Sequence, residues 1–282
     1  MAAIGRHITT GKDYALIPGR AAQFGMTAFQ IFTGNPRGWS TKRPPVRKLR
    51  EAGRMCLELG LVCAIHSPYL INLARPSETD KGSKSQALLR RDLANAVDWG
   101  ESCLGVVVHM GKIADMGISE EEALDNYIQS VRQVIQDTPG GRIILETGAG
   151  VRGEVGTSLE GLAEIWEGIA EHRARVAFCI DTAHIWAAGY DISTSRGVRS
   201  YFRKFNRLIG SENIVLIHFN DSGRELDSHV DSHANVGIGL IGIEGLTEVA
   251  KWAKAHGVAV VCETPGIISP LVEMELIEEM VA

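Results

Sequence analysis

The segment Cys179-Ile-Asp-Thr-Ala-His-Ile-Trp-Ala-Ala-Gly-Tyr-Asp191 contains the pattern by which the rest of the chain can be interpreted. An apolar run over residues 175–180 ends at Asp181, and His184 follows three residues later. A buried strand that ends in a carboxylate and an imidazole brings two polar groups to the edge of a sheet, where burial is costly unless each has a partner. A divalent metal ion is one such partner. An aspartate that caps a helix beside a hydrogen-bonded histidine is the other explanation, so the remaining runs must be compared.

Eight short apolar runs alternate with eight segments of helical pattern along the chain. The runs cover residues 4–8, 27–32, 61–65, 105–108, 142–145, 176–180, 213–217 and 258–262. Helices are expected over residues 14–25, 46–60, 85–99, 119–136, 158–172, 196–208, 243–256 and 271–280. Continuous runs of Val, Ile and Cys are typical of parallel strands that are buried on both faces. The alternation therefore predicts an α/β fold, a (β/α)8 TIM barrel.

The predicted barrel forms a single domain over residues 1–282. No linker, low-complexity tract or change of composition divides the chain, and barrels of this kind commonly have about 250 residues. A doubly wound open sheet shows the same alternation and is the alternative fold. The glycine-rich GxGxxG motif that often follows the first strand of such a sheet does not follow the first run here.

The composition is typical of a soluble globular protein, with 45% hydrophobic and 22% charged residues. No apolar run approaches the roughly 18 residues of a membrane helix, and the first residues do not form a signal peptide. Five cysteines without a CxxC motif indicate reduced thiols and a cytoplasmic protein. The formal charge of −5 argues against nucleic acid as a partner, but bound metal ions would add positive charge at one place.

Polar residues capable of binding a metal stand at the ends of most of the runs. A TIM barrel brings the C-terminal ends of its strands to one rim, so we expect these residues to form a metal centre there. Imidazole and carboxylate groups without thiolates favour zinc, manganese or iron. Nine candidates are more than one ion can use and suit two or three ions. They are His66, His109, Glu146, Asp181, His184, His218, Asp231, His233 and Glu263, while His7 also ends a run.

Four motifs resemble those of the endonuclease IV family of apurinic/apyrimidinic endonucleases. They are His66-Ser-Pro-Tyr-Leu-Ile-Asn-Leu, Asp181-Thr-Ala-His-Ile-Trp-Ala-Ala-Gly-Tyr-Asp, His218-Phe-Asn-Asp-Ser and Asp231-Ser-His. The resemblance extends over residues 4–263. It implies a TIM barrel that uses three zinc ions to hydrolyse the phosphodiester 5′ to an abasic site in double-stranded DNA, leaving a 3′-hydroxyl and a 5′-deoxyribose phosphate. Manganese is possible at one of the three positions.

The same resemblance implies which residues bind each ion. The three sets are His66 and His109 with Glu146; Asp181, His218 and Glu263 with Glu146; and His184, Asp231 and His233. Glu146 and Glu263 are the residues expected to be catalytic. Since the ions activate the attacking hydroxide, no nucleophilic side chain is required.

The resemblance also implies a DNA-binding surface, with Arg37, Tyr69 and Leu70 entering the duplex at the lesion, and a monomeric enzyme. The chain departs from the family at Ser232, where an arginine is usual, and His229 stands where a basic residue is also common. These differences leave the nine ligands intact but remove positive charge near the phosphates, so we expect weaker DNA binding.

Two other functions fit part of the pattern. A metal-dependent sugar isomerase or epimerase on a similar barrel needs only Glu146, Asp181, His218 and Glu263. A DNA-binding barrel without activity is the third possibility. The remaining ligands and the pair of Tyr69 and Leu70 favour the nuclease.

Overall fold

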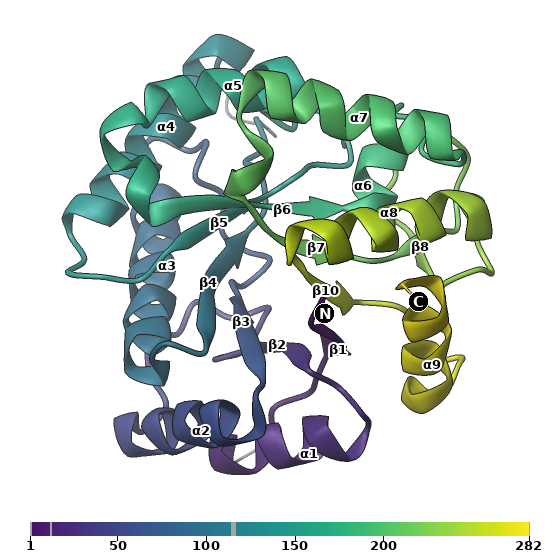
Figure 1. Ribbon diagram of the computed structural model, residues 1–282. Helices are drawn as coiled ribbons and strands as arrows, with labels where there is room; N and C mark the ends of the chain where they lie inside the picture. The colour runs from purple at the N-terminus through teal and green to yellow at the C-terminus, as the bar shows by residue number, and fades with distance from the viewer. Residues whose placement is uncertain (1, 12, 114–116, 282) are drawn as a thin grey trace.

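Eight parallel strands close into a barrel in the computed structural model, which describes residues 2–11, 13–113 and 117–281 (Figure 1). Around the barrel the order of strands is β1-β10-β7-β6-β5-β4-β3-β2. The strands are β1 (Ile4–His7), β2 (Ala28–Phe32), β3 (Val62–His66), β4 (Cys103–Val108), β5 (Ile143–Glu146), β6 (Val176–Asp181), β7 (Ile214–His218) and β10 (Ala259–Cys262). The predicted TIM barrel is confirmed, and the open sheet is excluded because β1 pairs with both β2 and β10.

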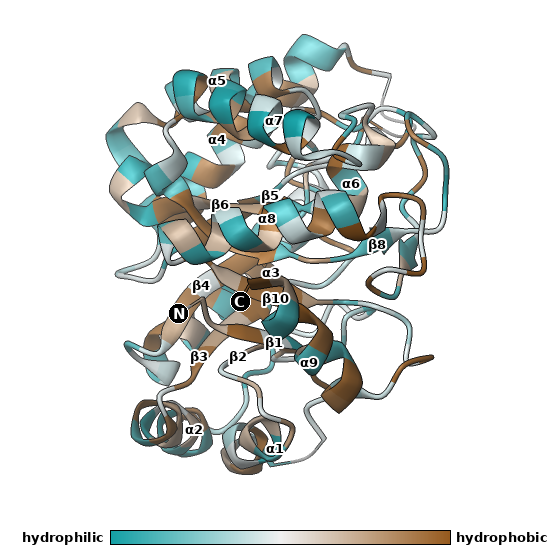
Figure 2. Ribbon diagram, turned by 45° about the vertical axis from the view of Figure 1, so that its right-hand side comes forward, coloured by the Kyte–Doolittle hydropathy of each residue, from teal (hydrophilic) through white to brown (hydrophobic). Residues whose placement is uncertain are grey.

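Helices cover the outside of the barrel, and hydrophilic residues occupy the outer faces of helices such as α5 and α7 (Figure 2). The helices that follow the strands are α1 (Ile17–Gln23), α2 (Val46–Leu59), α3 (Asp80–Trp99), α4 (Glu120–Gln136), α5 (Leu159–Gly168), α7 (Ser195–Leu208), α8 (Gly242–His256) and α9 (Pro270–Val281). Short 3-10 segments lie at η1 (Tyr14–Leu16), η2 (Ala170–Arg175) and η3 (Ser211–Asn213). No helix among the described residues combines the length and apolar character that crossing a membrane requires.

Side chains two residues apart on a strand point to the same face, so successive inward-facing residues form stacked layers inside the barrel, and two of these layers differ in character. The lower layer is apolar and comprises Ala28, Ala64, Val107, Ile144, Cys179, Leu216, Ala259 and Val261. Two residues further along seven of the strands, the upper layer is polar and comprises Gln30, His66, His109, Glu146, Asp181, His218 and Glu263. The polar C-terminal rim is therefore the next inward-facing layer after the apolar one.

Three of the predicted helices differ from the observed ones by more than one residue at an end. Helix α3 begins at Asp80 rather than at residue 85, because the Thr79 hydroxyl caps it by accepting the Gly82 N–H. The helix predicted over residues 158–172 ends at Gly168, and 3-10 turns follow it. The helix predicted over residues 14–25 consists of η1 followed by α1.

Two short elements at the rim were not predicted. Helix α6 (Thr182–Ala187) follows β6 without a loop, and the Asp181 carboxylate caps it by accepting the His184 N–H at 3.0 Å. Strands β8 (Asp221–Ser222) and β9 (His233–Ala234) form a small antiparallel pair. Helix α6 carries His184 and strand β9 carries His233, so short elements outside the barrel strands complete the rim.

Candidate metal centre

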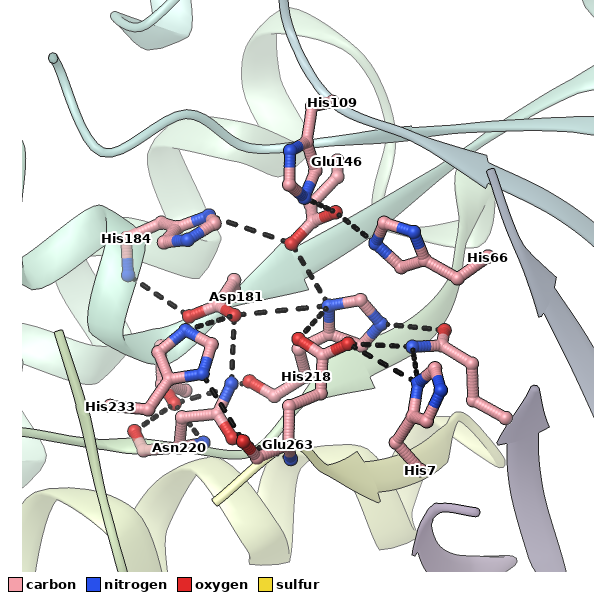
Figure 3. A network of polar contacts seen from close by, with 12 residues as sticks. His7, His66, His109, Glu146, Asp181, His184, His218, Asn220, His233 and Glu263 are labelled. Atoms are coloured by element: carbon pink, nitrogen blue, oxygen red, sulfur yellow. Dashed lines mark hydrogen bonds and ion pairs between the residues drawn. The ribbon is translucent and has the colours of Figure 1, made fainter. Parts of the chain in front are cut away.

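The C-terminal rim of the barrel brings the nine predicted ligands together at one place. Figure 3 labels all of them except Asp231. Three groups among the described residues have ligand atoms that all lie within 4.8 Å of one another. The groups are His66, His109 and Glu146; Glu146, Asp181, His218 and Glu263; and Asp181, His184 and His233. The first two contain the same residues as the predicted sets.

Glu146 lies at the centre of the first two groups and is almost completely buried at the end of β5. Its Oε2 is 3.3 Å from His66 Nε2 and 3.1 Å from His109 Nε2. Its Oε1 is 2.9 Å from His218 Nδ1. The two oxygens of one carboxylate therefore face two different groups, which is the arrangement of a bridging ligand.

The second group is completed from neighbouring strands. His218 Nδ1 lies 3.2 Å from Glu263 Oε2 and 3.8 Å from Asp181 Oδ2. Parallel pairing places these residues side by side, because β6 and β7 pair Asp181 with His218. Four donors around one position are enough for a tetrahedral ion.

The third group differs from the predicted set in its composition. Asp231 Oδ1 is 3.3 Å from His184 Nε2 and 3.2 Å from His233 Nε2, so the three predicted residues are adjacent. Asp181 Oδ2 is also 3.5 Å from His233 Nε2. Asp231 is the most exposed of the nine, with 46% of its side chain accessible, because it lies on a loop rather than on a strand.

The hydrogen bonds of the histidines fit a metal centre. His66 Nδ1 donates to the Ser67 carbonyl at 2.7 Å, and His184 Nδ1 donates to the Thr147 carbonyl at 2.8 Å. A backbone acceptor at one nitrogen leaves the lone pair of the other for a metal. The Nε2 atoms of His184 and His233 are buried and have no hydrogen bond among the described residues. Both atoms face Asp231 Oδ1, at 3.3 Å from His184 and 3.2 Å from His233, without forming a hydrogen bond, and a cation between them and this carboxylate would give each a partner.

The charges of the centre stabilise one another without an ion. Burial by itself raises the pKa of the Glu146 carboxyl, but His109 and His218 lower it well below its usual value. Burial lowers the pKa of His233, whereas Asp181 and Asp231 raise it to about 9. Without a bound ion the carboxylates therefore favour protonated imidazoles, and a metal ion would replace their charge.

Polar residues behind the ligands fix their orientation. Gln30, on β2, accepts from His218 Nε2 at 2.9 Å and donates to Glu263 Oε1 at 2.7 Å. Asn220 donates to Asp181 Oδ2 at 2.8 Å and accepts the Glu263 N–H at 2.8 Å. Sequence analysis missed both, although Gln30 has a detectable signal as a polar residue inside an apolar run.

His7 belongs to this supporting set and not to the three groups. Its Nδ1 accepts from Gln30 Nε2 at 3.1 Å and lies 3.8 Å from Glu263 Oε1. Burial lowers the pKa of His7, which keeps the ring neutral and able to accept.

A buried carboxylate at the start of α9 holds two of the rim loops. Glu273 accepts hydrogen bonds from Asn235 Nδ2 at 2.9 Å and from Thr264 Oγ1 at 2.8 Å. Asn235 follows His233 by two residues, and Thr264 follows Glu263 directly. Glu273 thus connects loops that carry ligands of the second and third groups, and it was also missed by sequence analysis.

The predicted DNA-contacting residues lie on two loops beside the centre. Tyr69 is 53% exposed, and its ring packs 5.3 Å from that of Phe32 and 5.8 Å from that of His109. Leu70 is partly exposed and Arg37 is exposed. The Tyr69 N–H donates to the Pro36 carbonyl at 3.0 Å, so the two loops support each other.

The loop that contains Ser232 is held in an unusual conformation. Asp227 and His229 have backbone φ angles of 63° and 53°, which residues other than glycine rarely adopt. The Ser232 carbonyl accepts the Gly223 N–H at 2.9 Å, and His229 Nε2 lies 3.4 Å from Asp227 Oδ1. The positions that depart from the resemblance therefore lie on a defined loop next to Asp231.

Comparison with known proteins gives the same fold and closely related sequences. Residues 18–279 match the family described as xylose isomerase-like TIM barrel. The chain is 40% identical over 277 residues to the putative endonuclease 4 of Acanthamoeba polyphaga mimivirus, covering 97% of this chain and 89% of that protein. The crystal structure of endonuclease IV from Thermus thermophilus superposes with a TM-score of 0.83 at 30% identity, covering 99% of this chain and 98% of that one.

A sugar epimerase shares the fold more distantly. The structure of 3-keto-D-glucoside 4-epimerase from E. coli has a TM-score of 0.65 at 17% identity and covers 99% of each chain. This similarity concerns the barrel alone.

Proposed function

Since the chain belongs to the endonuclease IV family of xylose isomerase-like TIM barrels, we propose that it is a DNA repair endonuclease that hydrolyses the phosphodiester 5′ to abasic sites. The products would be a 3′-hydroxyl and a 5′-deoxyribose phosphate. The observation that supports this most strongly is the meeting of three ligand groups around Glu146 and Asp181. We place the enzyme in the cytoplasm as a monomer.

The residues present suit three divalent ions, which we propose to be zinc, with manganese possible at one position. His66 and His109 would hold the first; Asp181, His218 and Glu263 the second; and His184, Asp231 and His233 the third. Glu146 would bridge the first two. When bound, such ions place positive charge at the attacked phosphate and lower the pKa of a water molecule.

Two carboxylates have catalytic roles in this proposal. Glu146 keeps the first two groups at a fixed separation, since its oxygens face both. Glu263 is held by Gln30 through Oε1, so that Oε2 faces the second position and would help to bind and orient the attacking water there. No nucleophilic side chain takes part, and the oxygen that attacks phosphorus comes from water.

We propose that the exposed loops recognise the lesion in double-stranded DNA. Tyr69 and Leu70 would enter the duplex where the base is missing, and Arg37 would bind on the adjoining loop. Opening the helix there costs less than unstacking an intact base pair. The packing of Tyr69 on Phe32 and His109 supports this role, because it fixes an exposed aromatic ring next to the metal centre.

A sugar isomerase or epimerase is the second candidate. Glu146, Asp181, His218 and Glu263 form a complete single-ion site, and the fold is shared with epimerases. The first and third groups have no role in that chemistry. We therefore rank it below the nuclease.

Incision of a labelled duplex with one stable abasic analogue tests the proposal. We expect a single cut on the 5′ side of the analogue, loss of cutting after prolonged chelation, and recovery with zinc. The matched control is the same duplex with an intact base. If fully metal-loaded protein leaves the abasic strand intact, the nuclease proposal is wrong. Turnover of a ketose by the same sample would then support the epimerase, and binding of the duplex without cutting would support a non-catalytic DNA-binding protein.

A further inference from the structure

A small cavity lies beside the first and third ligand groups. Its volume is about 20 Å³, which is enough for roughly one water molecule. His109, His184 and Asp231 line it on the side of the metal centre. Lys112 and Glu154 also line it. Among the described residues that line the cavity, Lys112 is the only lysine or arginine. A cation from outside the nine ligands therefore adjoins two of the ligand groups.

The backbone of Lys112 is fixed on both sides. Its N–H donates to Asn72 Oδ1 at 3.0 Å, and its carbonyl accepts from Asn72 Nδ2 at 2.7 Å. It also forms an antiparallel bridge with Glu154, and the next residue, Ile113, donates its N–H to the Gly153 carbonyl at 2.6 Å. The loop after β4 thus holds the start of the Lys112 side chain at a defined place.

The end of that side chain is weakly held. Lys112 Nζ is 4.0 Å from Glu154 Oε1, and 43% of the side chain is exposed. An ion pair of this length and exposure contributes little to stability. Glu154 has another partner, because its Oε2 accepts the Gly150 N–H at 2.9 Å. The ammonium group can therefore turn to a stronger anion without leaving Glu154 unpaired.

Among the described residues that line the cavity, no second Lys or Arg accompanies the carboxylates of Asp231 and Glu154. Asp231 is anionic there, and the residue after it, Ser232, is uncharged. With ions bound, the charge of Asp231 would be balanced, but Glu154 would still repel a DNA phosphate at this side of the centre. A lysine at the same cavity offsets that repulsion with a compact positive charge.

Resting on the nuclease function proposed above, we propose that the Lys112 ammonium binds a phosphate oxygen of the DNA at the edge of the metal centre. Lys112 is then a DNA-binding residue that contributes to incision without binding a metal. It provides positive charge beside the first and third groups, where Ser232 provides none.

The test is steady-state incision by the zinc-loaded protein over a range of salt concentrations. K112M and K112A both remove the charge, and K112R keeps it. Loss of one charge-assisted hydrogen bond to phosphate should lower kcat/KM about tenfold. It should also reduce the slope of log(kcat/KM) against log[salt] by about one. K112R should retain most of the slope, and zinc content should be the same in all variants.

The double variant K112M/E154Q separates DNA binding from simple neutralisation of Glu154. If Lys112 binds phosphate, removing the Glu154 charge leaves the salt slope of K112M reduced. Full recovery of both rate and slope in the double variant would overturn the proposal. Unchanged kcat/KM and an unchanged salt slope in K112M and K112A would also overturn it. Wild-type protein that carries its metals but does not cut would instead refute the nuclease function, a result obtained before any variant is compared.

Discussion

The two layers inside the barrel are supplied by the same strands and differ in almost every physical property. Val107 and His109 illustrate this, because they are two residues apart and point to the same side of β4 and its continuation. The layer of Val107 consists of small apolar side chains that fill the barrel. The layer of His109 consists of histidines, carboxylates and Gln30, most of them buried.

The comparison shows that backbone geometry does not distinguish a core from a site. Burying an aliphatic side chain in the lower layer contributes about 1.5–3 kcal/mol to stability. Burying an ionised group in the upper layer is costly unless a partner balances its charge. Among the described residues, the clustered ligand groups lie at the C-terminal side of the barrel, which is where an enzyme of this fold binds its substrate.

The largest loss of incision is expected when His109, in the upper layer, is replaced. We expect His109→Ala to abolish incision, because the first group would keep only His66 and Glu146. Circular dichroism should show an intact fold, since part of the His109 ring is exposed at the rim. Activity close to that of the wild type would remove His109 from the metal centre.

A smaller loss of incision is expected when a residue behind the ligands is changed. Gln30→Leu removes the hydrogen bonds that orient His218 and Glu263. Changes of this kind typically reduce metal affinity or activity about 10- to 100-fold. Zinc affinity and kcat should be measured on the purified variant. If both are unchanged, Gln30 fills space and does not position the ligands.

Outside the two layers, Tyr69→Ala should weaken incision of duplex DNA without lowering zinc content. Loss of one stacking aromatic ring typically costs about 1–3 kcal/mol of binding. The effect should appear mainly in KM, because the Tyr69 ring packs against the ligands His66 and His109 but belongs to none of the three ligand groups. Loss of zinc from this variant would mean that Tyr69 has a structural role.

The smallest effect on incision should come from the lower layer. Val107→Ala leaves a cavity in the apolar layer and should lower the free energy of unfolding by roughly 2 kcal/mol. Incision at 25 °C should remain, because the ligands two residues away keep their partners. Thermal unfolding and the incision assay on one sample measure both. Loss of zinc in this variant would show that the layers are not independent.

Much of the upper layer could be predicted from sequence because of a simple contrast. Glu146, Asp181 and His218 each end an apolar run, so the change from apolar to polar marks the rim. Parallel pairing in a barrel then determines that the ends meet. The three ligand sets came from family resemblance, since spacing alone does not divide nine residues into groups.

The unpredicted features depend on short segments and on register. Helix α6 has six residues, which is too few for an apolar period to be recognised. Gln30 lies within an apolar run, and only the parity of the strand shows that it points inward. The loop that carries Asp231 and His233 depends on Asp221, whose buried carboxylate accepts the N–H groups of Gly237, Gly239 and Ile241. Such contacts have no local sequence pattern.

The most direct test of the three-ion metal centre is a calorimetric titration with zinc of protein from which a chelator has removed all metal. Three ligand groups predict uptake of about three equivalents. Without metal, His184 and His233 have raised pKa values, about 9 for His233, so they are protonated at pH 7. Zinc requires their lone pairs and must displace those protons. Buffers with different ionisation enthalpies will report the protons released.

We predict about three equivalents of zinc, release of about two or more protons at pH 7, and the return of incision as the sites fill. The share of proton release from His233 should disappear above about pH 9, because that ring is then already neutral. Uptake of a single equivalent, with no cutting of abasic DNA after saturation, would contradict the account. The upper layer would then be a mononuclear site, as the epimerase alternative requires.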